Sequence, residues 1–183
     1  MSYAKALSGL KDFAKRELFE QDPLEYRAHV ANESDRASIL LNGSMVERFL
    51  VHELSERLTL LNSDEKTRLF AYGGPCGSFA SRIQFAQAMG IINRSMRKKI
   101  DLIREMRNAA AHGHVSVDFS TPEIRAAVFA LIDAKHRPRV SKANATQVRI
   151  LYEYLCGAFN LEILGEPQGQ EIAELIESLP VAF

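Results

Sequence analysis

The stretch SDRASILLNGSMVERFLVHELSERLTLL, residues 34 to 61, decides the fold class of this chain. Its apolar residues recur at spacings of three, four or seven, the period of one face of a long amphipathic α-helix. They are Ile39, Val46, Leu50, Leu54, Leu58 and Leu61. Ser34 or Asp35 is a suitable N-cap, because a short polar side chain there accepts a hydrogen bond from a free backbone N–H of the first turn. The stretch predicts a long central helix.

The same periodicity runs through most of the remaining chain. It predicts helices over residues 64–70, 78–90, 93–113, 120–135, 147–161 and 170–179, and an N-terminal stripe of Leu7, Leu10, Phe13, Ala14 and Leu18. Residues 114–119, HVSVDF, alternate only weakly and predict an extended connector or one small hairpin edge. The chain has no strand–helix–strand rhythm, repeat period or sustained heptad pattern. We therefore expect an all-α fold, a multi-helix bundle of about seven or eight helices around the long one.

Length and composition favour one folded domain. The chain has 183 residues, 46% of them apolar, which is enough for a sizeable core. We expect a single helical domain over residues 1–183, with its core in residues 34–135, a basic and uncompacted linker at 136–146, and C-terminal helices over 147–183. No apolar run approaches the ~20 residues of a membrane span, and no signal-peptide pattern opens the chain, so a cytoplasmic protein without a membrane partner is expected. Cys76 and Cys156 lie far apart in the sequence of a chain expected to be cytoplasmic, so we expect both to be reduced thiols.

Charge is balanced overall but unevenly placed. The chain has 23 basic and 23 acidic residues, yet six basic residues lie between positions 94 and 107 and five between 135 and 149. Because attraction to phosphate depends on local rather than net charge, these segments predict contact with DNA or RNA. The candidate nucleic-acid-binding residues are Arg94, Arg97, Lys98, Lys99, Arg137, Arg139 and Lys142. A solvated helix face without a partner is the alternative.

The most distinctive motif is RNAAAH, residues 107–112, at the predicted end of a helix. Asn108 and His112 share a helix face, whereas Arg107 is offset from His112 by roughly 140°. Arg107, Asn108 and His112 are candidate catalytic residues for RNA cleavage, since histidine can move the proton of a ribose 2′-OH and arginine can stabilise charge on phosphate. The alternative is a structural helix end, with Arg107 paired to a carboxylate of the long helix and His112 interacting with the helix C-terminus.

Other motifs carry weaker signals. FAQAMGIINRSMRKKI, residues 85–100, resembles a helix-turn-helix, but Ile92 and Lys99 do not fit that pattern, and a plain antiparallel helix corner explains the same residues. His112 and His114 have no cysteine or carboxylate at metal-ligand spacing. We therefore expect no metal and no cofactor.

The block GGPCGSFASRIQFAQAMGIINRSMRKKIDLIREMRNAAAH, residues 73–112, together with FSTPEI at 119–124, resembles the signature of the mannitol operon repressor family. The likeness covers roughly residues 34–130, and Cys76 stands where that family usually has leucine. The resemblance implies an all-α bacterial transcriptional regulator that acts on nucleic acid or through a transcription-related protein partner.

RNAAAH also resembles the RxxxxH motif of the HEPN superfamily, whose helical members include metal-independent ribonucleases active as dimers. That resemblance implies Arg107, Asn108 and His112 as the catalytic set, with Glu47 or Glu53 as supporting acids. The sequence thus predicts a regulator acting as a helical binding module and forming a homodimer. A HEPN-type endoribonuclease is the alternative.

Overall fold

Helix α3 (Asp35–Arg57) is the long helix that the sequence predicts. Its N-cap is Ser34, whose side chain accepts a hydrogen bond from the backbone N–H of Ala37 at 3.2 Å. The helix stops at Arg57, because Leu58 adopts a ψ of 59° outside the helical region while its N–H still donates to the Leu54 carbonyl. The predicted helix is confirmed, but it ends four residues earlier than the apolar stripe suggests.

The structure, a computed structural model, describes Lys5, Ser8 and residues 23–178. The chain divides into two compact units, residues 1–33 and 34–183, which we describe separately. The first contains α2 (Pro23–Ala31), a helix that the sequence analysis did not predict because Asp22-Pro23 favoured a turn. Proline also suits the first position of a helix, and that role applies here. The predicted N-terminal stripe from Leu7 to Leu18 lies outside the described residues.

The second unit, called the main unit below, contains the other helices. After α3 follow α4 (Ser63–Phe70), α5 (Phe79–Ala88), α6 (Arg94–His112), α7 (Pro122–Leu131), the 3-10 turn η2 (Ala134–His136), α8 (Arg137–Val140), α9 (Ala145–Ile163) and α10 (Gly169–Ser178). The described residues contain no strand, so the all-α prediction is confirmed. Residues 114–119 form an extended connector in which Val117 and Phe119 are buried.

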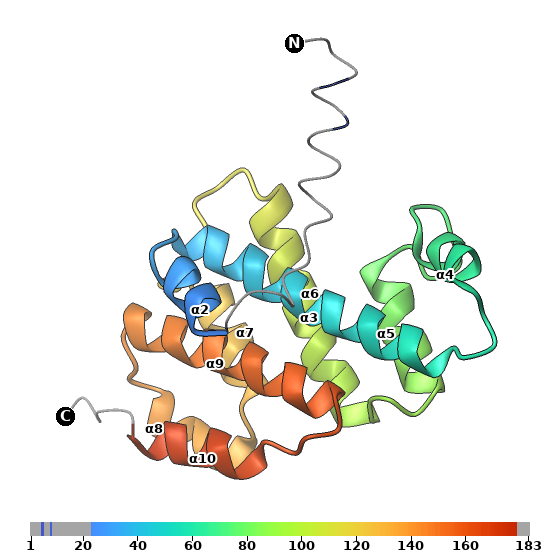
Figure 1. The fold of residues 1–183 in the computed structure, drawn as a ribbon. Coiled ribbons are helices and arrows are strands. Elements are labelled where there is room, and N and C mark those ends of the chain that lie inside the picture. Colours follow the sequence, from blue (N-terminus) through green and yellow to red (C-terminus); the bar gives the residue numbers. More distant parts are fainter. Residues whose placement is uncertain (1–4, 6–7, 9–22, 179–183) are drawn as a thin grey trace. The chain divides into compact units, whose positions relative to one another are not determined.

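Helix α9 runs parallel to α3 along one side of it (Figure 1). Near the start of both helices, Arg149 Nη1 lies 3.0 Å from Asp35 Oδ1. One turn further along both helices, Ser38 Oγ donates to Glu153 Oε1 at 2.8 Å. Deeper in the interface, the buried Tyr152 hydroxyl donates to the Ile39 carbonyl at 3.2 Å. The two helices therefore share a buried apolar seam that polar contacts hold in register.

Helix α6 runs antiparallel to α3 along another side (Figure 1). The two backbones meet closely at Gly43, where an added Cβ would lie 3.0 Å from the Cβ of Arg107. At the start of α3, Arg36 donates from Nε to the Ala110 carbonyl at 2.7 Å and from Nη2 to the Gly113 carbonyl. Arg36 thereby satisfies carbonyls that the last turn of a helix leaves without partners. These contacts fix where α6 ends.

The core of the main unit lies among α3, α5, α6, α7 and α9, whose inward faces are apolar. Its largest fully buried side chains include Ile39, Leu50, Leu54, Ile83, Ile100, Ile103, Phe119, Leu131, Tyr152 and Phe159. The rings of Phe119 and Tyr152 lie 5.6 Å apart in a tilted arrangement, which anchors the connector after α6. Among the described residues, no helix is both long and apolar enough to cross a bilayer.

Candidate functional site

The arginine of the RNAAAH motif lies in a polar cluster between α3, α5 and α6. Arg107 Nη2 lies 3.2 Å from Glu47 Oε2, and Arg107 Nε donates to Ser44 Oγ at 3.2 Å. Arg82 of α5 binds the other oxygen of the same carboxylate, with Nη1 2.5 Å from Glu47 Oε1. The Glu47 side chain is only 12% exposed, and one carboxylate thus joins three helices. The carboxylate partner from the long helix, which the structural alternative requires, is present.

Arg107 nevertheless keeps some access to solvent. Its side chain is 32% exposed, and its guanidinium lies 5.9 Å from the centre of the Phe79 ring at the start of α5. With two arginines around one carboxylate, the cluster carries an excess positive charge. An anion could therefore approach Arg107, although the guanidinium is oriented by protein groups and not held free for a substrate.

Asn108 and His112 lie on a different face of α6 from Arg107. The helix stays regular to its last residue, since the Gly113 N–H donates to the Ala109 carbonyl at 2.8 Å, so the offset of roughly 140° between Arg107 and His112 persists. His112 is exposed, and Asn108 makes no side-chain hydrogen bond to a described residue. The structure therefore does not gather the three candidate catalytic residues on one face. Of the two supporting acids, Glu47 contacts Arg107, whereas Glu53 pairs with Arg57 at 2.8 Å.

The loop GGPCG, between α4 and α5, is held by Arg82. This side chain donates from Nε to the Cys76 carbonyl and from Nη2 to the Phe70 carbonyl, both at 2.9 Å. The Cys76 thiol is free, and burial raises its pKa above the ordinary value while the Arg82 charge partly opposes the rise. A raised thiol pKa disfavours a nucleophilic role. The loop thus ties α4 and α5 to the Glu47 cluster.

The segment from α5 to α6 is an antiparallel helix corner. Arg82 near the start of α5 and Arg107 near the end of α6 share Glu47, and Gln87 near the end of α5 accepts a hydrogen bond from Arg97 near the start of α6 at 2.6 Å. Gly90, with a φ of 73°, makes the turn. A DNA-reading helix-turn-helix places its helices at about 90–120°, so the antiparallel alternative describes this corner.

The four basic candidates at the start of α6 differ in their exposure and in the contacts that their side chains make. Arg94 and Lys98 are exposed and have no hydrogen bond or ion pair within the described part of the chain. Arg97 is bound to Gln87 and lies 3.6 Å from Asp101. Lys99 pairs with Asp133 at 3.3 Å and lies over the Phe159 ring at 5.5 Å. Arg94 and Lys98 are therefore the residues of this set that can meet a phosphate without losing a contact.

The second basic segment is not the uncompacted linker that its composition suggests. Residues 134–140 form η2 and α8, and Val140 is buried. Arg137 donates from Nε to the Ile132 carbonyl at 3.0 Å, just after the end of α7, and Arg139 donates from Nε to the Ile176 carbonyl of α10 at 2.9 Å. The expectation was wrong because composition does not reveal these bonds, of which the one from Arg139 reaches a helix 37 residues away in sequence. Lys142 is exposed and unpaired among the described residues.

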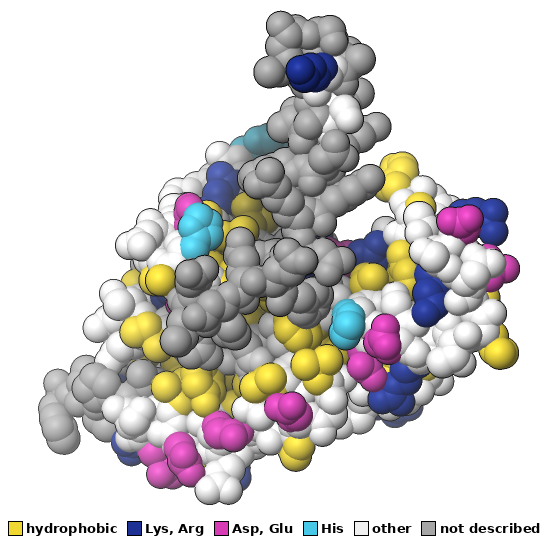
Figure 2. All heavy atoms as spheres, in the orientation of Figure 1, with side chains coloured by type: hydrophobic (Ala, Val, Ile, Leu, Met, Phe, Trp, Pro, Cys, Tyr) yellow, Lys and Arg dark blue, Asp and Glu magenta, His cyan; other side chains and the backbone are white. Residues whose placement is uncertain are grey.

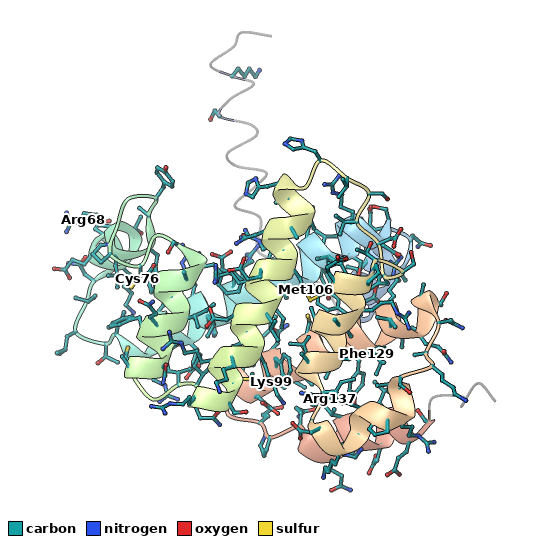
Figure 3. All side chains as sticks on the ribbon, turned by 180° about the vertical axis from the view of Figure 1, so that it is seen from behind. Arg68, Cys76, Lys99, Met106, Phe129 and Arg137 are labelled. Atoms are coloured by element: carbon teal, nitrogen blue, oxygen red, sulfur yellow. The ribbon has the colours of Figure 1, made fainter. Side chains whose placement is uncertain are left out.

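The two basic segments meet at one end of the main unit. The ion pair between Lys99 and Asp133 joins the second turn of α6 to the residue that precedes η2. Figure 3 shows Lys99 and Arg137 at this end, whereas Arg68 and Cys76 lie at the far side on α4 and the loop after it. Lys142 lies just before α9 begins, whereas Lys99 lies over Phe159 near the end of that helix. The exposed cations around the ion pair are therefore Arg94, Lys98 and Lys135. We call this set the basic end.

A shallow hollow of about 490 Å³ lies at the base of α4. It is lined by Val51, Ser55, Glu56, Ser63, Lys66, Thr67 and Phe70. Lys66 Nζ crosses it to donate to the Ser55 carbonyl at 2.6 Å. In the part of the chain that the structure describes, no three His, Cys, Asp or Glu side chains lie together as metal ligands.

Sequence reasoning missed Arg36, the residue that closes the RNAAAH helix. No local signal identifies it, because its acceptors, the carbonyls of Ala110 and Gly113, are more than seventy residues away. Comparison of the chain with models of known protein families, with curated proteins and with solved structures finds no match.

Proposed function

We propose that this chain is a helical nucleic-acid-binding module of a bacterial transcriptional regulator, in line with its resemblance to the mannitol operon repressor family. One observation carries the proposal: the Lys99–Asp133 ion pair brings two basic segments together, and the three cations around it, Arg94, Lys98 and Lys135, have no described acceptor. Such cations attract phosphate and release condensed counterions on binding. If each meets one phosphate, the logarithm of the binding constant falls with the logarithm of salt concentration at a slope of about −3.

The arrangement of charge along α6 favours an end-on contact. Arg94 and Lys98 lie on its exposed face, but Asp101 and Glu105 follow on the same face. These acids are paired with Arg97 and Arg104, so the later turns of this face offer no unpaired cation, and only the first turns of α6 present free positive charge to a phosphate. The contact is therefore expected to bind backbone phosphates with little dependence on base sequence.

Fluorescence anisotropy with labelled duplex DNA and RNA tests the proposal. We expect the double variant Arg94→Glu/Lys98→Glu to bind at least tenfold more weakly than the wild type at 50 mM salt on every sequence. The control is Arg68→Glu on α4, an exposed arginine without a described partner on the far side of the main unit. Equal affinity of the double variant and the wild type would overturn the proposal, as would binding that ignores salt.

A second candidate is metal-independent RNA cleavage, as the HEPN resemblance implies. The observation that favours it is that His112 is exposed and Arg107 is one-third exposed, so both remain accessible to RNA. The test compares RNA cleavage by the wild type and His112→Ala with EDTA present, on single-stranded and transfer RNA. Cleavage by the wild type alone supports catalysis, and absence of cleavage by two equally folded proteins rejects it. Light scattering on the same samples tests the homodimer.

A further inference from the structure

We propose that the outer face of α9 is the interface between two copies of this chain, with the two α9 helices packed antiparallel. The proposal starts from a row of residues at spacings of four, three, four and three along this helix and its C-cap. They are Ile150, Tyr154, Gly157, Leu161 and Leu164. On an ideal helix this spacing keeps all five within roughly 80° of one another. We call this row the α9 stripe.

The α9 stripe faces away from the core. Ile150, Leu161 and Leu164 are 44%, 37% and 39% exposed, whereas Tyr152 and Phe159 on the opposite face of the helix are fully buried. Figure 2 shows hydrophobic side chains gathered over the region of α9. Because a soluble protein gains free energy by burying such a patch, contiguous exposed apolar side chains mark a surface for association.

The charged residues of α9 lie outside the stripe. They are Arg149, Glu153 and Glu162. Arg149 lies 2.8 Å from Glu153 and 3.0 Å from Asp35, on the side of α9 that packs against α3. Glu162 lies on the side where the charge of Lys99 acts on it. The stripe is therefore uncharged along its whole length, which is the composition of the centre of a protein–protein interface.

The order of residues in the stripe is matched to a second copy of itself. Gly157, which has no side chain, lies at the centre, and a branched apolar residue stands seven positions away on either side. If two α9 helices cross antiparallel at this glycine, Ile150 lies opposite the partner's Leu164, and Tyr154 opposite the partner's Leu161. A twofold axis repeats each of these contacts, so one stripe supplies both halves of the interface.

The residues that flank α9 select the antiparallel direction. Lys142 precedes the helix, and Glu166 and Glu171 follow it; all three are exposed and have no ion pair with a described residue. An antiparallel pair places the basic flank of each α9 beside the acidic flank of the other, whereas a parallel pair places like charges together. The helix dipoles favour the same direction. Charge complementarity therefore points to a second copy as the occupant of this face.

The interface leaves the basic end accessible. Lys99 lies over Phe159, on the face of α9 opposite the stripe. Pairing of two chains and binding of nucleic acid thus use different surfaces. The oligomeric state can be measured without nucleic acid, and its result is independent of the proposed function.

Sedimentation velocity of the full chain tests the interface. We expect the wild type to form a dimer with a Kd on the order of 10 µM, because one helix pair buries less than the roughly 1,600 Å² of a standard interface. Leu161→Glu/Leu164→Glu places four carboxylates in the dimer interface and should weaken association at least tenfold. Ile150→Glu, at the other end of the stripe, should do the same. Circular dichroism shows whether each variant is folded.

The matched control is Leu60→Glu/Val115→Glu. It makes the same change of charge at two apolar residues that are more exposed than those of the stripe, in the connectors before α4 and after α6. This variant should dimerise as the wild type does, because neither position lies on α9. Equal weakening of the control and the stripe variants would show a general effect of net charge and reject the interface.

A spin label on Thr146→Cys, an exposed position beside the stripe, measures the direction of the pair. Both native cysteines are buried. In an antiparallel pair centred on Gly157, the rise of the helix separates the two labelled positions by about 33 Å along the axis. In a parallel pair the two positions lie about 10 Å apart, the distance between packed helices.

Three results would overturn the proposal. The first is a wild type that stays monomeric at concentrations well above the expected Kd. The second is a folded Leu161→Glu/Leu164→Glu variant that dimerises as tightly as the wild type. The third is a label separation of about 10 Å, which would reject the antiparallel arrangement. Loss of nucleic-acid binding by a chain that still dimerises would reject the proposed function alone.

Discussion

Glu47 and Arg107 form an ion pair across the closest approach of α3 and α6, with Glu47 Oε2 3.2 Å from Arg107 Nη2. The pair lies one turn along α3 from Gly43, which touches the Cβ region of the same arginine. Since Glu47 also binds Arg82, the carboxylate orients both the RNAAAH arginine and the loop before α5. The geometry of the candidate catalytic motif therefore depends on a residue outside it.

Removing the Glu47 carboxylate should strongly destabilise the fold. Glu47→Ala leaves two half-buried guanidinium groups without their shared partner, and we expect the free energy of unfolding to fall by about 3 kcal/mol. Urea denaturation followed by circular dichroism measures it. The control is Glu53→Ala, which breaks a more exposed pair with Arg57 and should cost less than about 1 kcal/mol. Equal losses for both variants would contradict the structural role of Glu47.

Gly43→Ala should destabilise the protein even though alanine is the better helix former. The new methyl group would meet the Arg107 Cβ at 3.0 Å, and because that atom belongs to a packed helix, α6 must move. We expect a loss of about 1–3 kcal/mol in denaturant unfolding. Gly169→Ala, which meets nothing within 4 Å, should leave stability unchanged or raise it by about 0.5 kcal/mol. A Gly43→Ala variant as stable as the wild type would show that the two helices separate without cost.

Asp118 should make the stability of the α7 start dependent on pH. Hydrogen bonds from the Ser120 hydroxyl and backbone, followed by weaker ones from Thr121, hold the pKa of Asp118 below its ordinary value. A carboxyl with a lowered folded pKa contributes stability that is complete above about pH 4 and disappears as pH falls through the folded value. We therefore expect Asp118→Asn to lower Tm at pH 7 and to differ little from the wild type at pH 2.5. A Tm difference that stays constant between these pH values would contradict this role.

The two cysteines should react with alkylating reagents at different rates. Burial raises the pKa of Cys156 to about 12, so its thiolate is scarce, and the residue lies in the centre of α9. Cys76 is also buried, but it lies in a loop after α4, a helix with no buried residue, so local opening exposes it more often. Mass spectrometry after brief iodoacetamide treatment at pH 8 should find Cys76 modified first. In 6 M urea both should react alike, and earlier modification of Cys156 in the native protein would contradict this order.

The sequence predicts helices well where the signal is local. Asn93 starts α6 by accepting a hydrogen bond from Met96, at the predicted position, and apolar spacing marks the inward face of the helix. Helix α9 starts at Ala145, two residues before the predicted start, and its cap Asn144 lies in the segment predicted as a linker. The start of α7 is an instructive exception. The helix predicted over residues 120–135 begins at Pro122, the Thr121 side chain does not cap it, and Asp118 accepts the Thr121 N–H. Which of several neighbouring polar residues accepts these hydrogen bonds depends on the direction in which the chain enters the helix, and residue spacing does not encode that direction.

The sequence does not predict contacts between distant residues. RNAAAH was visible as a motif, but whether Arg107 faced His112 or Glu47 depended on the packing of α6 against α3. The basic residues at 137 and 139 suggested a solvated linker, because nothing nearby in sequence reveals that the end of α10 lies within reach of Arg139. The sequence identifies the basic residues of the basic end, but it does not predict that the two segments lie together in the fold.

Arginine recurs at the ends of helices in this fold. Arg36 binds the last carbonyls of α6, Arg82 that of α4, and Arg139 those of α10. A planar guanidinium can serve two acceptors at once, whereas an ammonium group is a point charge on a flexible stem. During evolution, a substitution of arginine by lysine at these positions would keep the charge but weaken the contact between two helices. Natural selection should therefore retain arginine at positions 36, 82 and 139, where the planar group is needed. It should allow lysine at position 94, where only the charge matters.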